Sequence, residues 1–238
     1  MGLPNSYSID LPIRCLDLLN LALPVVERDG QTAERHRGPL TTTLTLALAT
    51  PMLVIPIERI QKYLGYENEG YADDRKISEY LAQRLQQAVN EKKLKDYTEF
   101  ADFDWAFAQT NDLFNSARGL PNSLAENLNT QEAAGAAREM PVAQFLACLR
   151  NALSHGGILY LNDDGHSTHG QASKLCFVSA RMSYPRPICM QAAARCPKQE
   201  PQLTGLRLLR ISETGFRRFL ATWATWLREA DLADLASQ

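Results

Sequence analysis

The most regular pattern of apolar and polar positions lies between residues 141 and 157. Pro141 is tolerated in the first turn of a helix, and Gly156-Gly157 is typical of a helix end. Between them, apolar side chains recur at helical spacing and form one face: Val142, Phe145, Leu146, Leu149, Ala152 and Leu153. The opposite face carries Gln144, Cys148, Asn151 and His155. The pattern predicts a motif helix over 138–156 with its polar face turned away from the core.

Helical spacing also predicts a group of N-terminal helices within residues 1–118. The apolar segment 9–28 forms the first, and Pro24 ends or kinks it. The polar stretch ERDGQTAERHRG indicates a loop before a second helix, which opens at Pro39. PMLVIPIERIQKYLGY predicts a short third helix that ends near Gly65. A fourth helix is predicted by one apolar face: Ile77, Leu81, Leu85 and Ala88.

Two stretches separate these helices from the motif helix. The first supplies aromatic side chains that we expect in the core: Phe100, Phe103, Trp105, Phe107 and Phe114. The second, residues 119–137, has the sequence GLPNSLAENLNTQEAAGAA, which is polar, small and turn-rich. It predicts a long loop or lid leading into the motif helix.

After Gly157 the apolar period changes from helical to alternating. ILYLNDDG predicts a short strand and a turn, KLCFVSARM a second strand and LRLLRIS a third. Ser212 can cap a final helix over 212–230, which has a core-facing stripe: Phe216, Phe219, Leu220, Trp223 and Leu227. The expected fold is therefore mainly α: a single domain over 1–238, a helical bundle with a small antiparallel β-sheet (157–211) inserted before the last helix.

Composition excludes several classes of protein. The apolar fraction of 45% and the charged fraction of 22% are those of an ordinary folded protein. Five irregularly spaced cysteines form no disulfide framework, and no signal peptide begins the chain, so a cytoplasmic protein is expected. Pro51 and Pro56 interrupt the most apolar run, 40–57, which favours core helices over a membrane span.

The charge is unevenly distributed along the chain. Residues 1–137 carry 13 basic and 19 acidic side chains, whereas residues 138–238 carry 12 and 8. The segment 174–218 contains nine basic and two acidic residues. A basic surface beside the motif helix would favour a polyanion such as RNA, although a solvated Arg-rich loop gives the same composition.

The motif helix brings three kinds of chemistry together. Asn151 and His155 are four residues apart and share a face, and Arg150 adjoins them. Histidine transfers protons near neutral pH, arginine matches phosphate geometry, and asparagine can orient the imidazole. These groups suit metal-free cleavage of RNA by the ribose 2′-OH. Weaker candidates for RNA contacts are Gln144, Ser154, Arg181 and Arg186.

One histidine cannot conveniently act as acid and base in a single step. A symmetric homodimer would bring a second copy of the motif into the same groove. The small side chains of Ala143 and Ala147 would allow a partner helix to approach.

Three other interpretations of the same residues stay open. His155 can simply interact with the negative end of the helix dipole. His166, His169 and Cys176 have zinc-like spacing, but a fourth ligand is not evident. Cys148 and His155 could form a nucleophile pair, although seven residues separate them by about two helical turns. We therefore expect neither a metal nor a cofactor.

LRNALSHGG resembles the signature of the HEPN superfamily, in which an Arg, usually followed by an Asn or another polar residue, is separated from a His by four to six residues. The layout of PMLVIPIERI, ILYLNDDG, KLCFVSARM and LRLLRISETGFRRFLATWATWL resembles a plasmid-borne, proteobacterial branch of that superfamily. The resemblance implies a helical bundle that dimerises through the motif helix. It also implies a metal-independent endoribonuclease of toxin–antitoxin or defence systems that leaves a cyclic phosphate, with Arg150 and His155 catalytic and Asn151 supporting them.

One departure concerns regulation. In HEPN toxins controlled by a nucleotidyltransferase antitoxin, a Tyr two residues beyond the His accepts the nucleotide, and this chain has Gly157 there. That control is doubtful here, although an antitoxin protein is a possible partner. The family also contains non-catalytic modules that bind RNA, nucleotides or proteins, and a purely structural dimer is a third alternative.

Overall fold

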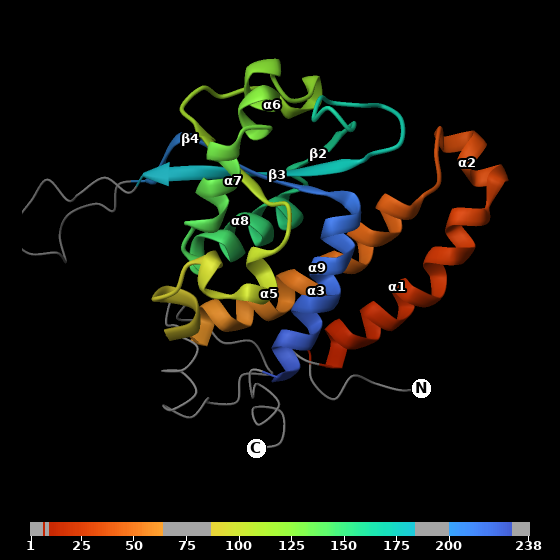
Figure 1. Ribbon diagram of the computed structural model, residues 1–238, viewed down its shortest axis with the longest axis horizontal. Helices are drawn as coiled ribbons and strands as arrows, with labels where there is room; N and C mark the ends of the chain where they lie inside the picture. Colours follow the sequence, from red (N-terminus) through yellow and green to blue (C-terminus); the bar gives the residue numbers. More distant parts are fainter. Residues whose placement is uncertain (1–6, 8–9, 64–86, 184–199, 230–238) are drawn as a thin grey trace, which may run out of the picture.

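The computed structural model describes residues 7, 10–63, 87–183 and 200–229, drawn in colour in Figure 1. The fold is mainly α with a small antiparallel sheet, which confirms the expected class. Its helices are α1 (Asp10–Arg28), α2 (Gly30–His36), α3 (Thr41–Tyr63), η1 (Leu94–Asp96), α5 (Thr98–Ala101), η2 (Ser116–Arg118), α6 (Asn122–Leu128), α7 (Gln131–Arg138), α8 (Val142–His155) and α9 (Glu213–Glu229). The strands are β1 (Ala106–Thr110), β2 (Ile158–Leu161), β3 (Lys174–Ser183) and β4 (Gln202–Ser212).

The sheet has one strand more than the sequence predicted. Its order is β1-β4-β3-β2, and all neighbouring strands are antiparallel. Strands β2, β3 and β4 are the three predicted ones, whereas β1 comes from the aromatic stretch before the motif helix. The sheet is therefore not a simple insertion, and residues 1–118 are not purely helical. In β1, Phe107 packs on one face of the sheet, and Ala106 and Ala108 pack on the other. Because both faces are buried, the sequence of β1 lacks the alternation of apolar and polar residues that marks a strand.

The two faces of the sheet are covered by different helices (Figure 1). Side chains of one face, among them Phe177 and Leu209, join the main core with α1, α3, α8 and α9. The other face packs against α6 and the start of α7 through a smaller cluster that includes Cys176 and Leu208. The sheet thus separates the motif helix from α6 and the start of α7.

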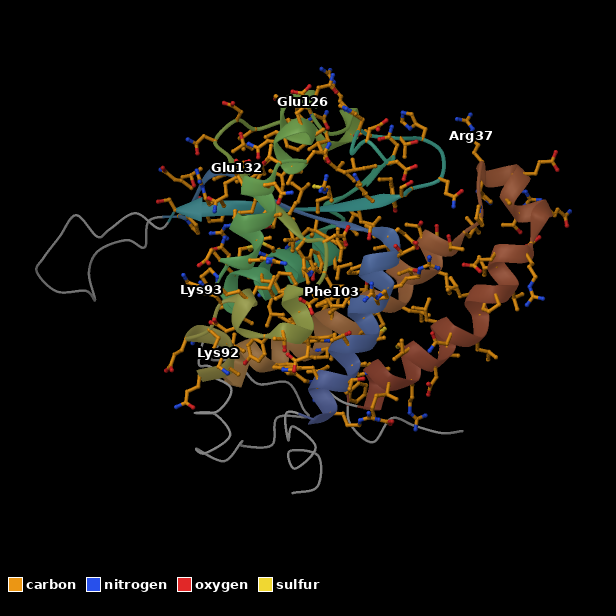
Figure 2. The ribbon with its side chains drawn as sticks, in the orientation of Figure 1. Arg37, Lys92, Lys93, Phe103, Glu126 and Glu132 are labelled. Atoms are coloured by element: carbon orange, nitrogen blue, oxygen red, sulfur yellow. The ribbon has the colours of Figure 1, made fainter. Side chains whose placement is uncertain are left out.

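Residues 119–137 are not the long loop or lid that the sequence predicted. They form α6 and α7, which bury Ala125, Leu128 and Ala133 against the sheet. Glu126 and Glu132 lie exposed on these two helices (Figure 2). The helices escaped prediction because they are short and present small alanines, which give little apolar contrast.

Helix α7 also covers an edge of the sheet. Ala133 belongs to the smaller cluster and Ala137 to the main core, so α7 passes from one face to the other beside β1. Because β1 is an edge strand, this helix shields part of an otherwise exposed edge.

Helix boundaries in the N-terminal part differ from the predicted ones in three places. Pro24 lies inside α1, and α3 runs unbroken through Pro51 and Pro56, where two helices were expected. The predicted polar loop holds α2, which Asp29 caps by accepting from the Thr32 amide. The predicted helix with Ile77, Leu81 and Leu85 falls almost entirely outside the described residues.

Helix α3 tolerates Pro56 because another helix replaces the missing hydrogen bond. Proline has no N–H, so the Met52 carbonyl lacks its usual donor four residues on. The indole Nε1 of Trp223 in α9 donates to that oxygen at 2.9 Å, and both side chains are buried. An interaction between helices therefore satisfies a carbonyl that would otherwise be buried without a partner.

Within the described residues, one helical segment, Thr41–Arg59, is long and apolar enough to cross a membrane. Its most buried side chains, Met52, Leu53 and Ile57, belong to the main core, and α3 packs against α8 and α9. This packing is compatible with the core helix of a soluble protein, as the two prolines suggested.

The C-terminal helix agrees with its prediction. It begins at Glu213, and the Ser212 hydroxyl accepts from the Gly215 amide at 2.9 Å as an N-cap. The five apolar side chains of its predicted stripe are all fully or almost fully buried: Phe216, Phe219, Leu220, Trp223 and Leu227.

We predict that Trp223→Phe lowers the free energy of unfolding by about 2 kcal/mol, because the Met52 carbonyl loses its donor. In a Pro56→Ala background the amide of residue 56 can donate instead, so the same substitution should cost about 1 kcal/mol less. Urea unfolding of the four proteins measures this coupling. Trp226→Phe on the same helix is the control, and equal costs of Trp223→Phe in both backgrounds would contradict the interpretation.

Candidate functional site: the outer face of helix α8

Helix α8 packs as the sequence predicted. It begins at Val142 after Pro141, which occupies the N-cap with φ −56°. All six residues of the predicted apolar face are buried, between α3 on one side and strand β3 on the other. The helix is thus fixed to two neighbours along its length, which holds its remaining surface in one orientation.

Two adjacent glycines end the helix for different reasons. Gly156 adopts a left-handed conformation, φ 69°, and a Cβ there would meet open space. At Gly157 a Cβ would lie 2.3 Å from the Val178 carbonyl oxygen of β3. The Val178 amide donates to the Gly157 carbonyl at 2.7 Å, and the Gly157 amide donates to Ala152 at 2.8 Å. The motif helix is therefore joined to the sheet directly after His155.

Among the described residues, the less buried side of α8 carries the motif. We call it the outer face: Ala143, Ala147, Arg150, Asn151, Ser154 and His155. Ser154 and His155 are exposed, whereas Arg150 and Asn151 are half-buried and the Arg150 Nε atom is fully buried. The His155 imidazole is accessible to solvent. Arg150 precedes His155 by five residues, about 7.5 Å along the helix axis, and its side chain is packed against neighbouring residues as far as Nε.

Cys148 does not belong to the exposed polar face that the sequence predicted. Its side chain is 1% exposed, because strand β3 packs against that side of α8 and places Ser179 next to the thiol. Burial raises the pKa of the Cys148 thiol, and the Ser179 hydroxyl and the Arg207 guanidinium only partly offset that effect. A buried, protonated thiol is a poor nucleophile, which argues against a Cys148–His155 pair.

The weaker candidates for RNA contacts separate in space. Gln144 is half-buried on α8 and Ser154 is exposed there, but Arg186 lies outside the described residues. Arg181 donates to Gln109, to Asn111 and to the Thr204 carbonyl. Its guanidinium thus links the ends of β1, β3 and β4.

The zinc alternative does not fit the arrangement of its residues. The His166 Nδ1 lies 3.2 Å from the Asn122 side chain, whereas His169 is exposed in the β2–β3 connection. Cys176 is fully buried in the sheet, and burial raises the pKa of its thiol to about 12. Among the residues that the structure describes, no three His, Cys, Asp or Glu side chains could hold a metal ion.

A polar cleft of about 550 Å³ lies elsewhere, between α7 and the segment before β1. Its walls carry Asp102, Asp104, Arg138 and Arg210, and none of the motif residues lines it. Arg210 contacts Asn129 there, and burial lowers the pKa of its guanidinium. The cleft is therefore separate from the outer face of α8.

Sequence analysis missed one charged residue near the motif helix. Arg207 of β4 pairs across the sheet with Ser179 of β3 and lies close enough to Cys148 to affect its thiol. Arg207 and Arg210 of LRLLRIS lie on opposite faces of the strand, and only the pairing of β4 with β3 brings the face of Arg207 under α8. No local sequence signal could have given this pairing.

Comparison with known proteins gives one family. The family model described as HEPN pEK499 p136 matches residues 1–178, which include the whole of α8. No curated protein and no solved structure is significantly similar to the chain. Membership of a HEPN family suggests a nuclease or an RNA-binding module and, often, a dimer.

We predict that Gly157→Ala destabilises the protein by about 3 kcal/mol, because the new methyl group collides with the Val178 carbonyl. Gly156→Ala should cost only about 1 kcal/mol, the strain of a left-handed conformation in open space. Thermal and urea unfolding of both variants test the difference. Equal costs would mean that the contact between α8 and β3 is looser than described.

Proposed function

This chain belongs to the HEPN pEK499 p136 family, and on that premise we propose that it is a metal-independent endoribonuclease of a bacterial toxin or defence system. The observation that carries the proposal is the exposed His155 imidazole on the helix face that Arg150 adjoins. The Arg150 side chain is buried at Nε, whereas His155 lies in the last turn of α8, next to the Gly157–Val178 contact. RNA could reach both side chains without unfolding the helix.

The reaction is an internal transesterification. A general base removes the proton of the ribose 2′-OH, and the 2′-oxygen forms a bond to phosphorus while the bond to the 5′-oxygen breaks. A general acid protonates the departing 5′-oxygen, which leaves a 2′,3′-cyclic phosphate. We assign the proton transfer to His155 and the developing phosphorane charge to Arg150. Asn151, one turn before His155, orients the imidazole.

Two proton transfers in one step call for two groups, and a second copy of the chain can provide the other histidine. In a two-fold dimer with α8 facing its symmetry mate, each motif contributes to one shared groove. Ala143 and Ala147 support this arrangement, because their small side chains allow two helices to approach closely. RNA is thus the proposed substrate, and a homodimer in the cytoplasm the proposed state.

The alternative is a non-catalytic module that binds RNA, a nucleotide or a protein through the same face. It retains the exposed outer face but requires no proton transfer, so binding without cleavage distinguishes it. An antitoxin protein is a further possible partner, although Gly157 occupies the position of the modified Tyr in HEPN toxins of the nucleotidyltransferase type.

We predict that the purified protein cleaves single-stranded RNA in EDTA, and that His155→Ala and Arg150→Ala each slow cleavage at least about 100-fold. Mass spectrometry of the fragments should identify 2′,3′-cyclic phosphate ends. His169→Ala, which removes another exposed imidazole, should cleave at the parent rate.

Cleavage that persists in His155→Ala, or that stops in EDTA, would contradict the assigned mechanism. RNA that is bound but stays intact would instead favour the non-catalytic module. A salt-sensitive affinity would then identify binding through the phosphates.

For the dimer, we predict that Ala147→Trp raises the dissociation constant at least tenfold, because the bulky indole blocks close approach of two α8 helices. Analytical ultracentrifugation measures the constant. Ala136→Trp, at an exposed alanine of α7, is the matched control and should leave it unchanged. An unaltered dimer in Ala147→Trp would place the interface elsewhere.

A further inference from the structure

Arg207 lies on the face of the sheet that packs against the motif helix. It pairs with Ser179 of β3 on one side and with Gln109 of β1 on the other. Antiparallel partners point to the same face, and Ser179 lies next to the Cys148 thiol of α8. The Arg207 guanidinium therefore approaches α8 from the sheet, beside Cys148.

Arg207 lacks the acceptors that other arginines of the described sheet possess. Arg181 donates to three oxygen atoms, and Arg210 contacts Asn129. Arg207, in contrast, has no ion pair or hydrogen bond with any residue that the structure describes, and its Nε atom is buried without a partner.

The cross-strand partners of Arg207, Ser179 and Gln109, are uncharged, and so is the protonated Cys148 thiol beside it. Gln109 also accepts from Arg181, a second cation on the same face of the sheet. Arg207 itself is only half-buried, so a solute can reach it. A partly buried guanidinium without an anion is costly unless a ligand supplies one.

The place of Arg207 relative to α8 indicates which anion this is. Helical spacing places Gln144, Cys148, Asn151 and His155 in one row, which we call the sheet-facing edge of α8 because Cys148 in this row contacts strand β3. The row borders the outer face, and Cys148 precedes His155 by about 10 Å along the helix. An anion bound by Arg207 beside Cys148 would therefore lie about two helical turns from His155 along α8. It is a second negative charge at a distance along the same helix, which is the charge pattern of a polynucleotide backbone.

We propose that Arg207 binds a phosphate of the RNA away from the cleaved one. The strand then runs along the sheet-facing edge of α8, from His155 toward Gln144. This inference rests on the proposed function, which supplies the RNA. It adds a route for the strand and a binding residue that lies 52 positions beyond the motif in the sequence.

The test measures binding of a single-stranded RNA oligonucleotide in EDTA by His155→Ala protein, which keeps the groove but does not cut. Adding Arg207→Gln should raise the dissociation constant about fivefold to tenfold. The slope of log affinity against log salt should fall by about 0.7, the loss of one phosphate contact on a single strand. Arg118→Gln removes an exposed charge outside the α8 edge and should change neither quantity.

Arg207→Lys is a second variant that tests the proposal if Arg207→Gln does not fold. It keeps the charge without the planar fork, so the salt slope should stay at the parent value while the affinity falls. In His155→Ala protein that retains Arg207, bound RNA should also protect Arg207, but not Arg118, from the arginine reagent phenylglyoxal. Peptide mass spectrometry measures the labelling of each residue.

Unchanged affinity and salt slope in Arg207→Gln, or labelling of Arg207 that RNA does not reduce, would overturn this inference while leaving the proposed cleavage intact. If His155→Ala does not bind RNA and the parent does not cut it, the proposed function fails, and the inference fails with it.

Discussion

The junction between the motif helix and strand β3 is the constraint on which the candidate site depends. The Gly157 carbonyl accepts from Val178, and the close approach leaves no room for a side chain at residue 157. This junction fixes the rotation of α8 and the place where it ends. Because His155 precedes the junction by two residues, the histidine is held at the edge of the sheet. The same rotation of α8 also fixes the direction in which the Arg150 side chain leaves the helix. A motif on a loosely attached helix would lack this preorganisation.

The rest of the fold supports that helix from behind. Helix α3 packs along α8 and stays continuous through Pro56 because Trp223 of α9 satisfies the Met52 carbonyl. The opposite face of the sheet is closed by α6 and α7, so β3 is held from both sides. Among the described residues, one side of α8 is less buried than the rest, and it carries the small side chains of Ala143 and Ala147 together with Arg150 and His155. That side is the surface that we propose for RNA and for a second subunit.

The sequence predicted what depends on local periodicity and little of what depends on pairing between distant segments. The buried face of α8, its glycine end, the helix after Ser212 and three of the strands all follow from spacing along the chain. Strand β1 was missed because its aromatic residues also suit a helical core. Cys148 was assigned to the exposed face because the sheet that buries it lies beyond the helix in sequence. Arg207 stayed hidden for the same reason: only the register of β4 against β3 brings it under α8.

The central claim is that the outer face of α8 is shared by two copies of the chain, so that two histidines serve one groove. Its most direct test is the distance between spin labels placed at position 154 of each subunit, measured by pulsed electron paramagnetic resonance. Packed helices have axes about 10 Å apart, so with label linkers the account predicts a narrow distribution near 20 Å. A dimer whose labels lie much farther apart, on opposite surfaces, would contradict it.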